Sequence, residues 1–102
     1  MKSSLPVRIV SSAARAIEDS ATWWAINRPK APDALIADLE NALKLIASHP
    51  DIGARALNTK LEGVRRVHMA RIHYHLYYRV TNEPAIEVLA LWHTSRASQP
   101  NL

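Results

Sequence analysis

Polar side chains that could do chemistry alternate with apolar ones over residues 73–79. Every second position there carries one, in the order His73, His75, Tyr77 and Arg79. In an extended strand these four would share one face. A histidine exchanges protons near neutral pH, and an arginine stays charged and can bind phosphate with two hydrogen bonds. Such a set could deprotonate a ribose 2′-hydroxyl, protonate a departing 5′-oxygen and stabilise charge on phosphorus, which is the chemistry of RNA cleavage. A solvated sheet face or the docking surface for a partner peptide fits the same pattern.

The positive charge of the protein is concentrated in the same stretch. The net charge is +4, and residues 60–80 hold five basic side chains against Glu62 alone. The same segment holds Arg65, Arg66 and His68, and either Arg65 or Arg66, together with His68, could reach the polar face from a neighbouring strand. A basic segment this local favours an anionic partner, either nucleic acid or an acidic protein strip. A solvated strand face is the alternative.

Other kinds of site find little support. The sequence has no cysteine, which excludes disulfides, thiolate metal sites and a thiol nucleophile. His73 and His75 could both face one ion, but two ligands do not make a metal site. Only two glycines are present, which argues against a Gly-rich phosphate loop. We expect neither a metal nor a cofactor.

The first half of the chain predicts a strand and two helices. Residues 5–10 alternate in the manner of an edge strand. Ser11 and Ser12 offer an N-cap for a helix that runs to Asn27 or Arg28, and apolar residues recur in it at a spacing of four. A second helix follows, with Pro32 in its first turn, and ends near His49. Its buried face consists of Leu35, Ile36, Leu39, Ala42, Leu43 and Ile46.

The second half changes to a period of two. Residues 64–70, 72–80 and 85–93 predict three strands, and the last is expected to be central because both of its faces carry apolar residues. One of those faces is expected to hold Ile86, Val88, Ala90 and Trp92. The order is βααβββ, an α+β fold in which a helical hairpin packs on a small, mainly antiparallel sheet.

The whole chain, residues 1–102, is expected to be one such domain, with residues 97–102 as a frayed tail. No secretory signal is visible and no apolar run is long enough for a membrane span, so we expect a cytoplasmic protein without a membrane partner. Trp23 and Trp24 lie about 100° apart around a helix, so at most one points inward. The other, with Trp23 as the candidate, would anchor a partner. His49 and His68 are interpreted as structural.

Three short motifs in this order resemble the RelE/ParE superfamily of type II toxins. They are Gly63-Val64-Arg65-Arg66, Tyr74-His75-Leu76-Tyr77-Tyr78-Arg79-Val80 and Val88-Leu89-Ala90-Leu91-Trp92-His93-Thr94-Ser95-Arg96. With the βααβββ order, the resemblance covers residues 7–98. It implies a cognate antitoxin that wraps the toxin and neutralises it. Because residues 60–80 are basic, we expect that antitoxin to be acidic, to lie along residues 64–79, and to make any contact with operator DNA itself.

The resemblance implies two different activities. RelE-like members cleave mRNA on the ribosome, and ParE-like members poison DNA gyrase. The position of the catalytic arginine of the nucleases is occupied here by His75, and no tyrosine follows His93, so we favour a ParE-like growth inhibitor. If the protein is a nuclease, His75, Arg65, Arg96 and His93 are the candidate catalytic residues. Arg66, His73, Tyr77, Arg79 and Trp23 are the candidates for binding antitoxin or target. A third alternative is a non-toxic remnant that only binds antitoxin.

Overall fold

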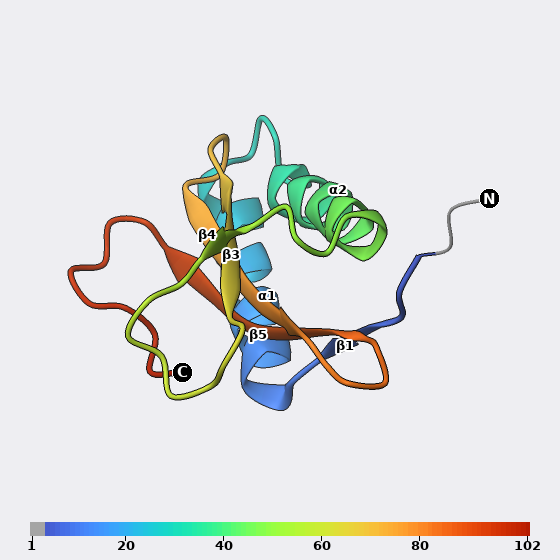
Figure 1. Cartoon of the computed structure of the whole chain (residues 1–102). Helices are drawn as coiled ribbons and strands as arrows, with labels where there is room; N and C mark the ends of the chain where they lie inside the picture. The colour runs from blue at the N-terminus through green and yellow to red at the C-terminus, as the bar shows by residue number, and fades with distance from the viewer. Residues whose placement is uncertain (1–3) are drawn as a thin grey trace.

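A computed structural model describes residues 4–102 and shows two helices packed on a five-stranded sheet (Figure 1). The elements, in chain order, are β1 (Val7–Ile9), α1 (Ser11–Asn27), α2 (Ala34–Ser48), β2 (Ala54–Arg55), β3 (Arg65–Met69), β4 (Tyr74–Val80) and β5 (Ile86–His93). The predicted α+β class, the helical hairpin and the three strands of the second half are confirmed. The two-residue strand β2 was not predicted. None of the helices among the described residues is long and apolar enough to cross a membrane.

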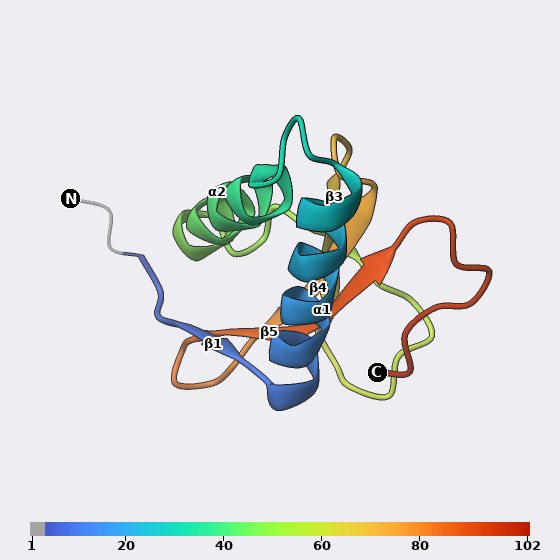
Figure 2. The same ribbon diagram turned by 180° about the vertical axis from the view of Figure 1, so that it is seen from behind.

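The strand order of the sheet is β1-β5-β4-β3-β2. β1 runs parallel to β5, and the other pairs are antiparallel. β5 therefore lies inside the sheet, as its two apolar faces predict. The view from behind shows α1 and α2 on one side of the strands (Figure 2). We call the side that they cover the helix face and the opposite side the open face.

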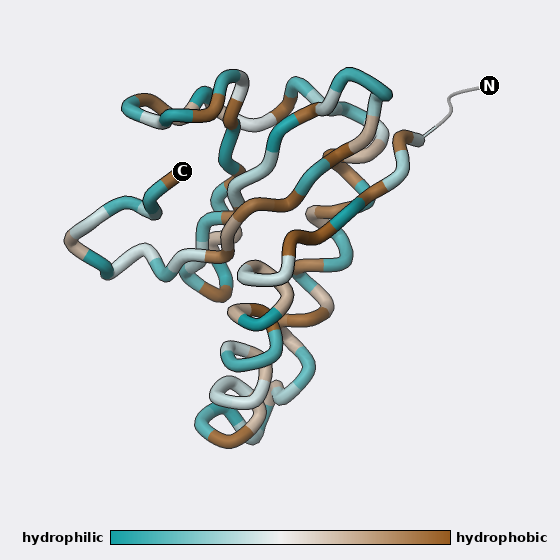
Figure 3. Tube along the Cα trace, turned by 90° about the horizontal axis from the view of Figure 1, so that it is seen from below, coloured by the Kyte–Doolittle hydropathy of each residue, from teal (hydrophilic) through white to brown (hydrophobic). Residues whose placement is uncertain are grey.

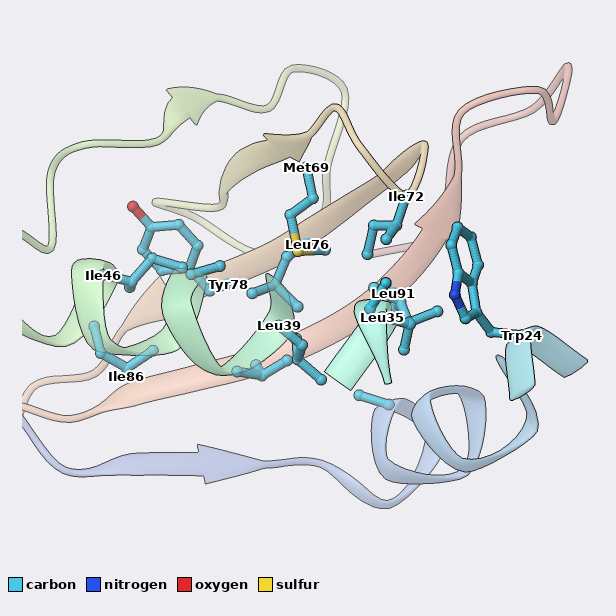
Figure 4. Close-up of a cluster of buried hydrophobic side chains, with 14 residues drawn as sticks. Trp24, Leu35, Leu39, Ile46, Met69, Ile72, Leu76, Tyr78, Ile86 and Leu91 are labelled. Atoms are coloured by element: carbon cyan, nitrogen blue, oxygen red, sulfur yellow. The ribbon is translucent and has the colours of Figure 1, made fainter. Parts of the chain in front are cut away.

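The main core lies between the helices and the helix face (Figure 4). From the helices it takes Trp24, Leu35, Leu39 and Ile46, and from the sheet Leu76, Tyr78, Ile86, Val88 and Leu91, among others. Apolar and polar residues are interspersed along the helices and strands (Figure 3). Each helix buries one apolar stripe. The short strands β1 and β2 are exposed throughout, and β5 is buried on both faces. Trp24 is 8% exposed and Trp23 is 48% exposed, which confirms that only one of the two points inward.

Both helices begin differently from the prediction. The N-cap of α1 is Val10 rather than a serine, and no side chain caps the helix. The Val10 N–H donates to the Val88 carbonyl at 3.1 Å, so the pairing with β5 continues up to the helix and leaves no room for a separate capping turn. Pro32 precedes α2, which begins at Ala34, because residues 31–34 form a turn whose Ala31 carbonyl accepts from the Trp24 indole at 2.9 Å. Ile36, placed on the buried face of α2, is 37% exposed.

A β-bulge in β5 overturns the predicted faces of that strand. Tyr77 pairs with Ala90 and Tyr78 with Val88, so Leu89 is an extra residue between them. Because side chains alternate, one extra residue exchanges the faces of everything that follows. Leu91 therefore joins Ile86 and Val88 in the main core, and Ala90 and Trp92 turn to the open face with Leu89.

The open face carries a second, smaller cluster. Its buried members are Val64, Tyr77 and Leu89, and Leu102 packs against them. The tail, expected to fray, returns to this face: the Trp92 indole donates to the Ser98 carbonyl at 2.8 Å, and the Lys60 N–H donates to the Leu102 carbonyl. The tail and the loop before β3 thus cover one end of the open face and leave β3 and the start of β4 accessible.

Candidate functional site

The accessible part of the open face gathers basic and aromatic side chains from three strands. In the β3–β4 ladder Arg66 lies opposite Tyr77, and His68 lies opposite His75. In the β4–β5 ladder His75 lies opposite Trp92. Residues directly opposite each other in an antiparallel pair share a face. These five side chains therefore lie on one face, and we call them the His75 surface. Tyr77 is buried, at 3% exposed, and the other four are at least partly accessible.

The two histidines of this surface are in contact. The ring centroids of His68 and His75 lie 5.0 Å apart in an edge-on arrangement, and His75 lies 6.2 Å from the ring of Tyr77. Partial burial, together with the positive charges of Arg66 and His68, lowers the pKa of His75 below its ordinary value of 6.5. A neutral imidazole here can accept a proton or a hydrogen bond at neutral pH.

Arg66 brings a permanent charge that no carboxylate neutralises in the described part of the chain. Its guanidinium approaches the Tyr77 hydroxyl at 3.5 Å, at the limit of a hydrogen bond. The salt bridges among residues 4–102 involve other arginines: Arg8 with Glu83, Arg65 with Asp51, Arg71 with Asp38, and Arg79 with Glu87. Arg66 is thus available to an anionic ligand.

The four candidate catalytic residues do not come together. Arg65 lies opposite Tyr78, on the helix face, and its guanidinium donates to the Gly53 carbonyl at 2.7 Å and the Asp51 carbonyl at 3.2 Å. His93 lies opposite Tyr74, stacks edge-on against it at 4.9 Å, and bonds to Ser95 at 2.6 Å. Only His75 and Arg96 belong to the open face, where Arg96 sits 4.0 Å above the Trp92 ring.

The candidate binding residues also occupy different places. Arg66 and Tyr77 are on the His75 surface. Arg79 shares that face but forms a 2.7 Å ion pair with Glu87 directly across from it. His73 precedes β4 in a turn, with a left-handed φ of 62°, and so does not continue the strand face as predicted. Trp23 is remote from all of these, near the end of α1, where Arg28 lies 5.2 Å from its ring.

A groove of about 440 Å³ opens beside the His75 surface at the edge of β3. Its lining comprises Leu45, Ile52, Gly53, Ala54, Arg66, Val67, His68 and His75. Leu45 is 43% and Ile52 51% exposed, which is high for such large apolar side chains. The groove combines apolar walls with three basic side chains, a composition suited to a peptide with acidic and apolar residues.

Sequence reasoning missed two features of this site. It allowed His68 to reach this face from the neighbouring strand but interpreted the residue as structural. It did not foresee that the short turn between β3 and β4 sets a register that places His68 beside His75. That register could have been read from the turn length. It also missed the walls of the groove, because Leu45, in α2, and Ile52, in the loop that follows α2, belong to no motif. Over the described part of the chain, no three His, Cys, Asp or Glu side chains converge as a metal site would require.

Comparisons with known proteins agree with this architecture. The sequence matches the family described as the ParE toxin of type II toxin–antitoxin system, parDE, over residues 7–98. The fold resembles a solved structure, the toxin–antitoxin complex RelBE2 from Mycobacterium tuberculosis, with a TM-score of 0.62 and 23% sequence identity over 89% of this chain and 99% of that one. A comparison with curated protein sequences found no significant match. The chain belongs to the ParE toxin family and is the toxin component of a type II toxin–antitoxin system.

Proposed function

We propose that this toxin inhibits growth by binding a protein target and not by cleaving RNA. DNA gyrase is the first candidate target, because poisoning of gyrase is the activity that the resemblance to ParE-like toxins implies. The observation that carries the proposal is the separation of the candidate catalytic residues. Arg65 and His93 lie on the helix face, Arg65 is bonded to backbone carbonyls, and His75 lies on the opposite face.

We also propose that a cognate, acidic antitoxin binds this chain in the cytoplasm and neutralises it. Support comes from Arg66, which has no salt bridge within residues 4–102, and from the two histidines beside it. The resemblance to a structure that contains a toxin–antitoxin complex supports it as well. Complementary charge mainly accelerates the encounter of two proteins. The association rate should therefore fall as ionic strength rises, and a rate that ignores salt would contradict an acidic partner.

A ribosome-dependent endoribonuclease is the second candidate function. One observation favours it: Arg66, His68 and His75 lie side by side, where a neutral His75 could act as a base and Arg66 could hold a phosphate. This set differs from the one expected from the sequence, since only His75 is common to both.

Two assays on the purified protein separate these functions. The proposal predicts inhibition of gyrase supercoiling, and intact mRNA when the 5′ ends are mapped in a reconstituted translation reaction. New 5′ ends that require ribosomes would establish the nuclease instead. Activity in neither assay would favour another protein target if the chain stops growth when expressed, and the non-toxic remnant if it does not.

A double variant, Arg66→Gln with His75→Gln, tests the residues in the same assays. A nuclease should lose its cleavage, because both the phosphate ligand and the base are gone. Arg55→Gln is the matched control, since Arg55 is an exposed arginine on the neighbouring strand β2 and lies outside the groove.

A further inference from the structure

The end of α1 carries two large apolar side chains that the fold leaves exposed. Trp23 is 48% exposed and Ile26 is 72% exposed. Residues three apart on a helix are neighbours, so these two side chains form one apolar patch. The turn that follows protrudes at one end of the molecule, at the top of both views (Figures 1 and 2). We call residues 23–32 the hairpin tip.

Hydrogen bonds hold the hairpin tip in one conformation. The Trp24 indole donates to the Ala31 carbonyl at 2.9 Å, and the Ala31 N–H donates to the Arg28 carbonyl at 3.0 Å. Pro29 and Pro32 fix φ at two further positions. A partner would therefore meet a surface that is already ordered, which lowers the entropic cost of binding.

The hairpin tip is also positively charged. It contains Arg28 and Lys30 and no acidic residue; the acidic residues that flank it in the sequence are Asp19 and Asp33. The salt bridges in the described part of the chain involve neither of the two cations. The guanidinium of Arg28 lies 5.2 Å from the centre of the Trp23 ring, within the range of a cation–π contact. Charge and apolar surface are thus presented together.

We infer that the hairpin tip is the surface through which the toxin binds its protein target, and that it enters an apolar cleft with an acidic rim. The inference rests on the proposed function, inhibition of a protein such as gyrase by binding. Tryptophan and arginine are among the residues that most often dominate the binding energy of protein interfaces. Trp23 and Ile26 would fill the cleft. Arg28 and Lys30 would meet carboxylates at its rim.

Two other occupants fit the hairpin tip less well. A symmetric dimer would bring Arg28 and Lys30 of one copy against the same residues of the other, and like charges repel. A nucleic acid requires a line of cations along its phosphates and free aromatic rings for its bases. The hairpin tip offers two cations, and Arg28 already lies against its exposed ring.

The first test compares two side chains of equal exposure in the gyrase supercoiling assay. Ile26 and Leu57, which lies in the loop between β2 and β3, are both 72% exposed, so replacing either should leave the core intact. Ile26→Ser should weaken inhibition at least about tenfold, and Leu57→Ser should leave it unchanged. Trp23→Ser should weaken inhibition at least as much. The midpoint of thermal unfolding checks that each variant is folded.

A second test removes the charge of the hairpin tip. Arg28→Gln combined with Lys30→Gln should weaken inhibition about tenfold and reduce its dependence on ionic strength. Arg15→Gln combined with Lys44→Gln is the matched control, because it removes two exposed cations from other parts of the helices. The control should behave as the unchanged protein does.

These experiments separate the inference from the proposed function. If the unchanged toxin inhibits gyrase and the Ile26→Ser and Trp23→Ser variants inhibit it equally well, the inference is overturned and the function stands. If the unchanged toxin does not inhibit gyrase, that target is wrong, and growth arrest on expression becomes the readout. Arrest that is lost with Ile26→Ser and kept with Leu57→Ser supports the hairpin tip. Arrest kept by both variants, or no arrest by the unchanged toxin, overturns it.

The two other occupants have their own readouts. Self-association that is measured by analytical ultracentrifugation and lost with Ile26→Ser would assign the hairpin tip to a second copy. Binding of a single-stranded oligonucleotide that is lost with Trp23→Ser would assign it to a nucleic acid. Either result, with inhibition of gyrase unchanged in the same variant, would overturn the inference.

Discussion

Among residues 4–102, the core between the helices and the helix face buries fourteen residues, whereas the buried cluster on the open face consists of Val64, Tyr77 and Leu89. The helix face is covered by regular helices, and the open face by a loop and the chain's last residues. Polar side chains with unused bonding capacity, such as Arg66, lie on the open face. This division indicates that one face supplies most of the stability of the fold while the other is available for recognition.

The largest expected effect comes from shortening a buried leucine on each face of the sheet, Leu76 in β4 and Leu89 in the neighbouring strand β5. Leu76→Ala empties the centre of the main core, where the side chain is fully buried, and should lower the free energy of unfolding by about 3–4 kcal/mol. Leu89→Ala, in the small cluster of the open face, should cost about 2 kcal/mol because the loop and tail can collapse into the space. Chemical denaturation measures both, and equal losses would contradict the division of labour between the faces.

Gly53 and Gly63 separate two reasons why a position requires glycine. One is a lack of space for a side chain, and the other is a backbone conformation that other residues rarely adopt. Gly53→Ala would place a methyl group 2.8 Å from the Tyr78 hydroxyl and 2.9 Å from the Arg66 carbonyl, so it should cost about 2–3 kcal/mol. Gly63→Ala has open space but a φ of +74°, so it should cost about 1 kcal/mol from strain alone. If Gly63→Ala lowered the midpoint of thermal unfolding more than Gly53→Ala did, the close contact between Gly53 and the Tyr78 hydroxyl would contribute little to stability.

The next comparison is between the hydroxyl groups of Tyr77 and Tyr78, adjacent residues of β4 whose side chains lie on opposite faces of the sheet. Tyr78→Phe removes a hydroxyl bonded to both the Gly53 N–H and the Pro50 carbonyl, and should cost about 2 kcal/mol. Tyr77→Phe removes a hydroxyl whose partner, Arg66, lies 3.5 Å away, and should change stability by less than about 0.5 kcal/mol. Urea denaturation of the two variants measures both losses. A Tyr78→Phe variant with unchanged stability would mean that the hydrogen bonds of Tyr78 to Gly53 and Pro50 do not stabilise the fold.

The smallest expected effect is the dependence of stability on pH that comes from His75. The pKa of His75 is lowered from 6.5 in the folded state, so the unfolded chain takes up this proton first as pH falls. The contribution of His75 to stability is therefore complete above pH 6.5 and declines as pH falls toward the folded pKa. His75→Gln should flatten the dependence of unfolding free energy on pH in this range. An unchanged slope would mean that the environment of His75 does not penalise its charge.

Elements governed by local pattern were predictable from the sequence. The end of α1 at Asn27 was predictable, because the apolar stripe stops there and a proline follows at position 29. The inward position of Trp24 and the outward position of Trp23 follow from the pitch of a helix. The class of fold could likewise be derived, because the change from a helical to an alternating period separates the two halves of the chain.

Features that depend on distant partners were not predictable. The bulge at Leu89 exists only with respect to β4, so the faces of Ala90, Leu91 and Trp92 could not be read from β5 alone. The separation of Arg65 from His75 follows from strict alternation, but the bonds that engage Arg65 come from residues 51 and 53, in a loop without a pattern. The groove owes its existence to the late start of β2 at Ala54, which leaves Val67 and His68 without a paired strand and for which the sequence gives no signal.

The most direct test of the division between the two faces is amide hydrogen exchange on the toxin, alone and in complex with its cognate antitoxin. We expect new protection at residues 66–69 and along β4 next to the His75 surface, and little change in the sheet-facing sides of α1 and α2, which are already buried. Protection confined to exposed parts of the helices, around Trp23 or Ile26, would contradict the account, because it would place recognition on the side of the molecule to which we assign stability.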